Sequence, residues 1–255
     1  MTTYIFKGIV LPERAQITLF PPIKLVVMNK ATDKVKFESQ LSVNRNQITC
    51  WVDTNSECNL DELLDLKNEV KAHISTILAI VGFINGCAYD IEITQVINKE
   101  KPIDYVYGID IPCIRERNKN ININDKLNSL LSKVSSSDIS SIYLSRCFTD
   151  LIMAMKNPID TGFYCYRAIE SLRQYCKNKY NIGEDNKSAQ WKKLRDITGY
   201  AEKSDFEDYI KVVTDFAYPI RHGDIIHITD SQRIEIFMKT WDVVEAFLEK
   251  YQDFN

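Results

Sequence analysis

Apolar and polar residues alternate along much of the first third of the chain, with the period of two that predicts β-strands. The segments with strand-like patterns are residues 4–10, 15–19, 23–28, 34–43, 48–52, 91–97 and 105–109. Pro21 and Pro22 are expected to end the second segment, because proline donates no hydrogen bond to a sheet. Asn44-Arg45-Asn46 lies between two segments and predicts a hairpin turn, since asparagine tolerates positive φ.

A different period appears between residues 59 and 86, where apolar residues recur every three or four positions. Asn59, with Glu62 three residues later, predicts a capping box at the start of a helix. Asn85-Gly86 predicts its end, because glycine readily adopts the left-handed conformation that stops helices. We therefore expect a small α+β domain over residues 1–111, made of a sheet and one long helix.

Residues 112–126 are rich in Arg, Lys and Asn and poor in large apolar side chains, which predicts a linker. Residues 127–255 show helical periodicity joined by short breaks, which predicts an all-α up-and-down bundle. The helices are expected to start at Ser137 or Asp138, at Asp160 or Thr161, near Gln190, in a capping box at Ser204, and at Thr229 or Asp230. Pro219 is expected to end the fourth helix, and the whole chain is assigned to the α+β class.

The last predicted helix carries apolar residues at alternating steps of three and four. This seam consists of Ile234, Phe237, Trp241, Val244, Leu248 and Tyr251. Such a pattern is typical of a buried core, and secondly of a dimer surface between two helices.

Composition narrows the classes of protein. A net charge of −3, with 45% hydrophobic and 26% charged residues, is ordinary for a globular protein and excludes a strongly basic nucleic-acid-binding module. No stretch reaches the ~18 apolar residues of a membrane span. Seven cysteines without a CxxC pair predict reduced thiols and a cytoplasmic location. We expect no cofactor and no metal, because no phosphate-binding glycine motif or zinc-finger spacing occurs.

One short segment, residues 221–227, gathers chemically useful side chains. It contains Arg221, His222, Gly223, Asp224 and His227 after a predicted helix end. Arginine can hold a phosphate through its planar guanidinium, and histidine can move a proton near neutral pH. This combination suits chemistry on a phosphodiester.

The helical half resembles the HEPN superfamily over roughly residues 130–255. The resemblance rests on Phe163-Tyr164-Cys165-Tyr166-Arg167-Ala168-Ile169-Glu170-Ser171-Leu172 and on Arg221 followed, after five residues, by His227. It implies a helical bundle that acts as a homodimer through this domain. Catalytic members are metal-independent ribonucleases, often toxins or antiviral effectors, whereas others only bind or scaffold. Under this resemblance the amino-terminal domain would sense, regulate or recruit a protein partner.

Two registers of the motif remain open. In the first, His227 is the acid/base, Arg221 holds the phosphate and His222 occupies the polar position after the arginine. In the second, the family's His-Gly pair aligns with His222-Gly223, and no arginine then precedes the histidine at the family's spacing. The first register predicts catalysis, and the second predicts a scaffold.

Further residues are candidates for the same site. Glu170 could orient Arg221 through an ion pair, and Arg167 and Arg173 lie three residues on either side of it, on the same helix face, as candidate RNA contacts. Lys192 belongs to a basic run that could contact RNA or simply face water. Equally, Arg221 could pair with Glu170 or Asp224 and only hold helices together. The two hypotheses are an RNA endonuclease and a non-catalytic binding protein.

Overall fold

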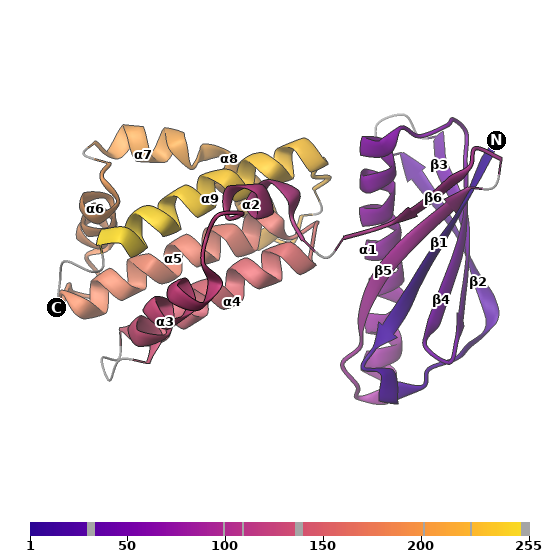
Figure 1. The fold of residues 1–255 in the computed structure, drawn as a ribbon, viewed down its shortest axis with the longest axis horizontal. Helices are drawn as coiled ribbons and strands as arrows, with labels where there is room; N and C mark the ends of the chain where they lie inside the picture. Colours follow the sequence, from indigo (N-terminus) through magenta and orange to yellow (C-terminus); the bar gives the residue numbers. More distant parts are fainter. Residues whose placement is uncertain are drawn as a thin grey trace. The chain divides into compact units, whose positions relative to one another are not determined.

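The computed structural model describes residues 1–29, 34–98, 100–108, 110–135, 140–200, 202–224 and 226–250. The chain divides into two compact units, residues 1–109 and residues 110–255, and each unit has its own apolar core. Figure 1 shows a sheet with a helix in the first unit and a group of helices in the second. The predicted α+β class is confirmed.

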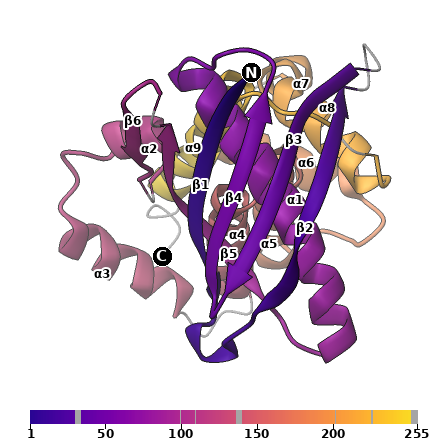
Figure 2. The ribbon, with the colours of Figure 1, turned by 90° about the vertical axis from the view of Figure 1, so that its right-hand side faces the viewer.

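The first unit contains a six-stranded sheet in the order β2-β3-β4-β1-β5-β6, in which every neighbouring pair is antiparallel. The strands are β1 (Thr2–Leu11), β2 (Leu19–Asn29), β3 (Lys34–Asn44), β4 (Gln47–Thr54), β5 (Asp90–Asn98) and β6 (Ile103–Val106). Figure 2 shows helix α1 (Leu60–Asn85) lying across one face of this sheet. Alternate strand residues such as Tyr4, Phe6 and Val10 are buried in the core, as the period of two predicts.

Helix α1 begins and ends where its sequence predicts. The Asn59 side chain accepts a hydrogen bond from the Glu62 amide, and the Glu62 carboxylate accepts one from the Asn59 amide. Gly86 closes the helix in the left-handed conformation, at φ 64°. The apolar stripe is buried along most of its length, but Ile84 is exposed near the carboxyl-terminal end.

The hairpin prediction at residues 44–46 is confirmed, because Arg45 and Asn46 both adopt positive φ between β3 and β4. The Asn46 side chain is buried, accepting a hydrogen bond from the Ile17 amide at 2.6 Å and donating one to the Glu13 carbonyl. Two strand predictions differ from the structure. Ala15 lies in a short 3-10 helix, η1 (Glu13–Ala15), and β2 continues through Pro21 and Pro22 because it is an edge strand.

The predicted linker, residues 112–126, contains helix α2 (Pro112–Arg117) and the start of helix α3 (Ile123–Val134). Ile114 is buried in the core of the second unit, and Arg117 forms ion pairs with Asp242 and Glu245. The second unit thus begins before residue 127, because one apolar residue and one cation attach this polar segment to the helices. The expected strand end at Ile109 lies outside the described residues.

The other helices of the second unit are α4 (Ser141–Lys156), α5 (Thr161–Lys179), α6 (Lys187–Thr198), α7 (Lys203–Tyr209), α8 (Lys211–Arg221) and α9 (Asp230–Lys250). Helix α5 is central and packs against α4, α6, α8 and α9. Cys165, Ile169, Leu172 and Cys176 recur at steps of three and four along α5, and all four are fully buried. Gly162 lies where α5 meets α8, and a Cβ there would come within 2.7 Å of the Phe216 Cβ.

Several predicted helix ends differ from the structure. Ser204 does not cap a helix, because α7 starts at Lys203, after its N-cap residue Glu202. The single helix expected from Ser204 to Pro219 is divided into α7 and α8 by Ile210, which is not helical. Pro219 does not end α8, which continues to Arg221. A proline near a helix end costs only the hydrogen bond that its missing amide would have donated. The expected helix starts at Ser137 and Asp138 lie outside the described residues.

The start of α9 follows its sequence. Thr229 accepts a hydrogen bond from the Gln232 amide, and Gln232 accepts one from the Thr229 amide, which together form a capping box. Along the seam, Phe237, Val244 and Leu248 are buried in the core, whereas Ile234 is exposed. The seam is therefore mainly core packing, and its last residue, Tyr251, lies outside the described part of the chain.

Candidate functional site

The segment between α8 and α9, here called the α8–α9 corner, contains Arg221, His222, Gly223, Asp224 and His227. All five residues are exposed. Arg221 is the last residue of α8, and His227 precedes the cap of α9 by two residues. The structure therefore leaves the predicted catalytic side chains accessible to solvent at one end of two helices. Ile225, between them, lies outside the described residues.

The backbone of the corner has a definite geometry. Gly223 adopts φ 87°, its amide donates to the Ile220 carbonyl at 3.0 Å, and the Asp224 amide donates to the Pro219 carbonyl at 3.0 Å. These two bonds with a left-handed glycine form a Schellman motif. Gly223 thus has a structural reason to follow His222, whichever register of the motif applies.

Arg221 differs from the other arginines of this region. Its side chain makes no ion pair or hydrogen bond with any part of the chain that the structure describes. The alternative in which Arg221 pairs with Glu170 or Asp224 is therefore not observed. The nearby His222 ring packs against the exposed Tyr218 ring, with centroids 4.5 Å apart. The corner presents an unpaired guanidinium beside an accessible imidazole.

Glu170 and Arg173 are occupied within the bundle. Glu170 lies 3.9 Å from Arg173, which is buried, donates a hydrogen bond to Gln190 and lies over the Trp191 ring. Because Arg173 is buried and donates to Gln190, it is poorly placed to contact an RNA strand. Glu170 is not bonded to Arg221, so the predicted orienting pair is absent from the described residues.

Arg167 has a partner of its own. It forms an ion pair with the buried Asp150 at 3.1 Å and lies over the rings of Phe163 and Tyr164. Burial raises the pKa of Asp150, although Arg167 and Arg146 act in the opposite direction. Arg167 therefore links α5 to α4, and only Lys192 among the predicted RNA contacts is fully exposed.

The charge of Arg221 also acts on Tyr166 of α5. Burial raises the pKa of Tyr166, Glu170 raises it further, and the charges of Arg173 and Arg221 lower it. Arg221 is therefore close enough for its charge to act on Tyr166. Tyr166 also lines a pocket between α6, α7 and α8 that the sequence did not indicate.

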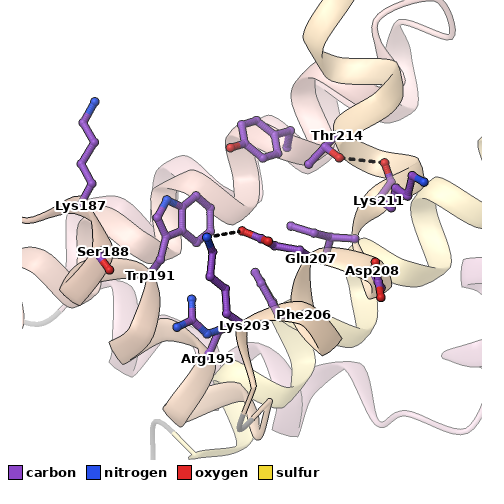
Figure 3. A pocket seen from close by; sticks show the side chains of 12 residues that line it. Lys187, Ser188, Trp191, Arg195, Lys203, Phe206, Glu207, Asp208, Lys211 and Thr214 are labelled. Carbon is purple, nitrogen blue, oxygen red and sulfur yellow. Dashed lines mark hydrogen bonds and ion pairs between the residues drawn. The ribbon is translucent and has the colours of Figure 1, made fainter.

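This pocket, here called the α6–α8 pocket, has a volume of about 540 Å³ (Figure 3). Its lining includes Trp191, Arg195, Lys203, Phe206 and Glu207. Lys187 and Arg195 also line the pocket, whereas Lys192 of the basic run in the sequence does not. The aromatic residues gave no usable signal, because aromatic residues at helical spacing are equally typical of core packing.

Across the described ranges, no group of three His, Cys, Asp or Glu side chains is placed to hold a metal ion. Within the same ranges, every helix is too short or too polar to cross a membrane. The chain is thus an α+β protein of two units, with an accessible Arg/His corner and a separate pocket in its helical unit.

Comparison with protein families agrees with this division. Residues 4–107 match the family described as "Domain of unknown function (DUF8168) N-terminal domain", and residues 129–252 match "Domain of unknown function (DUF8168) C-terminal domain". The two matches together span most of the chain, which belongs to the DUF8168 family. Comparisons with curated proteins and with solved structures gave no match.

Proposed function

We propose that this protein is a HEPN-type, metal-independent endoribonuclease that cleaves RNA at the α8–α9 corner. The single observation that carries the proposal is the state of Arg221, an exposed guanidinium without a partner among the described residues, in a segment that also exposes His222 and His227. An unpaired arginine at a solvent-facing helix end is available for a phosphate, because its donors are not already used.

The chemistry assigns different tasks to these side chains. Cleavage through the ribose 2′-hydroxyl needs a base to remove its proton and an acid to protonate the leaving 5′-oxygen. It also needs a cation that stabilises the negatively charged phosphorane formed between these two steps. His227 serves as acid or base, and Arg221 holds the phosphorane oxygens. The second imidazole comes from His222 or from His227 of a second copy in a homodimer formed through the helical domain.

The remaining parts of the proposal follow from the same resemblance. The protein would act in the cytoplasm as an antiviral-defence or toxin effector. The amino-terminal unit would recruit or sense a protein partner. Lys192, exposed on α6, would contribute to holding the RNA strand.

The alternative is a non-catalytic HEPN-like scaffold that dimerises or binds a partner. The Schellman motif accounts for Gly223 in either register, and this structural role is the only one that Gly223 needs in a scaffold. In that case the corner would be an ordinary helix end, and RNA would remain intact.

The test is RNA cleavage by the full chain in the presence of EDTA. We expect Arg221→Ala and His227→Ala each to lower the cleavage rate by about 100-fold or more, since acid–base groups contribute factors of this size. Arg14→Ala, which removes an exposed arginine from the first unit, is the matched control and should leave the rate unchanged. His222→Ala tests whether the second imidazole comes from this position.

Two outcomes would reject the proposal. The first is the absence of cleavage by the wild-type chain for a broad set of single-stranded and structured RNAs. The second is cleavage that both Arg221→Ala and His227→Ala leave unchanged. Retention of a specific complex with no cleavage would favour the scaffold.

A further inference from the structure

The α6–α8 pocket has an apolar, aromatic floor. The ring centroids of Trp191 and Phe206 lie 6.2 Å apart, and those of Trp191 and Tyr166 lie 6.4 Å apart. Ile210 completes this surface between α7 and α8. Planar apolar rings grouped in this way offer a surface on which a flat ligand can stack.

Cations surround this floor. Lys187, Arg195, Lys203 and Lys211 line the pocket, against the two carboxylates of Glu207 and Asp208. Figure 3 shows Lys203 extending towards Trp191 and Glu207, with the Arg195 guanidinium on the same side of the indole. Lys203 and Glu207 form an exposed ion pair at 3.4 Å, so Glu207 balances only one of these charges. The excess of positive charge favours an anionic ligand.

Arg195 carries an unused donor. Its Nε is buried and has no hydrogen-bond partner in the part of the chain that the structure describes. The Nε itself is closed to solvent, but no hydrogen bond or ion pair with the described residues occupies the terminal nitrogens of this guanidinium, so these nitrogens are available to an anion. The first turn of α6, with Lys187 and Ser188, also lies at the pocket, and helix amino-terminal amides favour anions.

We propose that the α6–α8 pocket binds one nucleotide, with its base on the aromatic floor at Trp191 and its phosphate at Arg195 and Lys203. The volume of about 540 Å³ lies in the range of small-molecule sites and accommodates a nucleoside monophosphate. The Glu207 carboxylate, which Figure 3 shows reaching towards Trp191, provides an acceptor for a ribose hydroxyl or a base amino group.

This binding site is independent of the proposed cleavage, because Arg221, His222 and His227 do not line the pocket. The nucleotide can come from two sources, as a free monophosphate or as one unit of an RNA strand. Both sources present the same base and phosphate to the same side chains. Tyr166 lines the pocket, and the charge of Arg221 lowers its pKa. A ligand in the pocket would therefore lie next to a residue on which the corner acts electrostatically.

Binding to the full chain is measured by isothermal titration calorimetry and by the change in tryptophan fluorescence. The ligands are each common ribonucleoside 5′-monophosphate, the matching nucleosides, ribose 5-phosphate and a short single-stranded oligoribonucleotide. We expect at least one monophosphate or the oligonucleotide to bind with a dissociation constant below about 1 mM. Nucleosides and ribose 5-phosphate should bind at least about ten-fold more weakly, since each lacks one recognised group.

Variants locate the binding. Arg195→Gln should weaken it by about ten-fold or more, whereas Lys126→Gln, which removes an exposed cation of α3 outside the pocket, should change it by less than about two-fold. Trp191→Phe should remove the fluorescence change. Tighter binding of the free monophosphate identifies a free nucleotide as the occupant, and tighter binding of the oligonucleotide identifies a strand.

Three results would overturn the proposal. They are no saturable binding of any monophosphate or of the oligonucleotide, equal weakening by Arg195→Gln and Lys126→Gln, and equal affinity for ribose 5-phosphate and the monophosphates. None of these results depends on RNA cleavage. Failure of this site is therefore distinguishable from failure of the proposed nuclease.

Discussion

Arg221 and Arg233 lie twelve residues apart, at the α8–α9 corner and in the bundle interior, and their surroundings are opposite. Arg233 is buried and donates hydrogen bonds to the Thr161 hydroxyl at 2.9 Å and to the carbonyls of Ala154 and Met155 at 3.2 and 2.7 Å. These carbonyls end helix α4, so Arg233 caps that helix from α9. Arg221 is exposed and has no such partner among the described residues.

The contrast separates two uses of the same side chain. A buried guanidinium whose donors are used contributes to stability, and burial lowers the pKa of Arg233 without neutralising it. An exposed guanidinium with free donors contributes little to stability and keeps its capacity to bind an anion. The residue type is the same in both cases, so the two roles are distinguished by the hydrogen-bond partners of each guanidinium.

The largest expected effect follows directly from this contrast. Arg233→Met should lower the free energy of unfolding by about 3 kcal/mol, because it leaves the Thr161 hydroxyl and the α4 carbonyls short of donors. Arg221→Met should change it by less than about 0.5 kcal/mol, as exposed substitutions do. Chemical denaturation of the full chain measures both. Similar losses in the two variants would contradict the distinction.

A pair of glycines sharpens the comparison at a smaller scale. Gly162→Ala should destabilise by about 2 kcal/mol, because the new Cβ meets both side chain and backbone of Phe216 between α5 and α8. Gly223→Ala should cost about 1 kcal/mol, since only the positive φ opposes it and no atom lies within 4 Å of the added carbon. Thermal unfolding ranks the two variants, and the reverse order would show that the corner is more tightly packed than its surroundings indicate.

The smallest expected effect concerns the buried Asp150. Burial raises the pKa of Asp150 in the folded chain above the ordinary 3.8. At pH values between the unfolded pKa and the folded pKa, the folded chain therefore binds a proton that the unfolded chain has released. Its stabilising contribution is therefore present below the unfolded pKa and is lost as pH rises through the folded pKa. The stability of wild type relative to Asp150→Asn should fall over this window in denaturation at stepped pH. A rise instead would mean that Arg167 outweighs burial.

Much of the fold was predictable because its signals are local. The capping boxes at Asn59 and Thr229, the turn at Arg45-Asn46 and the stripe of α5 depend on residues close in sequence. The predictions about Pro219 and the linker failed for a different reason. Whether a proline fits near a helix end, or a polar segment is held by Ile114 and Arg117, depends on contacts that are distant along the chain.

The candidate site was predictable in part. The residue types of the α8–α9 corner identify it, but the sequence does not reveal that Glu170 is next to Arg173 or that Arg167 pairs with Asp150. Glu170 lies within one helix turn of both Arg167 and Arg173, so the sequence does not say which of the two it pairs with. Asp150 lies on another helix, and its distance from Arg167 depends on how the helices pack. The α6–α8 pocket was missed because it combines side chains of four helices, none of which forms a sequence motif.

The two prolines of β2 have a consequence for the sheet border. β2 is an outermost strand, and Pro21 and Pro22 interrupt its pairing with β3 between Leu19 and Ile23. Neither imino acid has an amide hydrogen, so a foreign chain aligning there would find acceptors without donors. This part of the sheet edge therefore disfavours self-association through strand addition. Residues 24–29 of the same strand contain no proline and lack this protection.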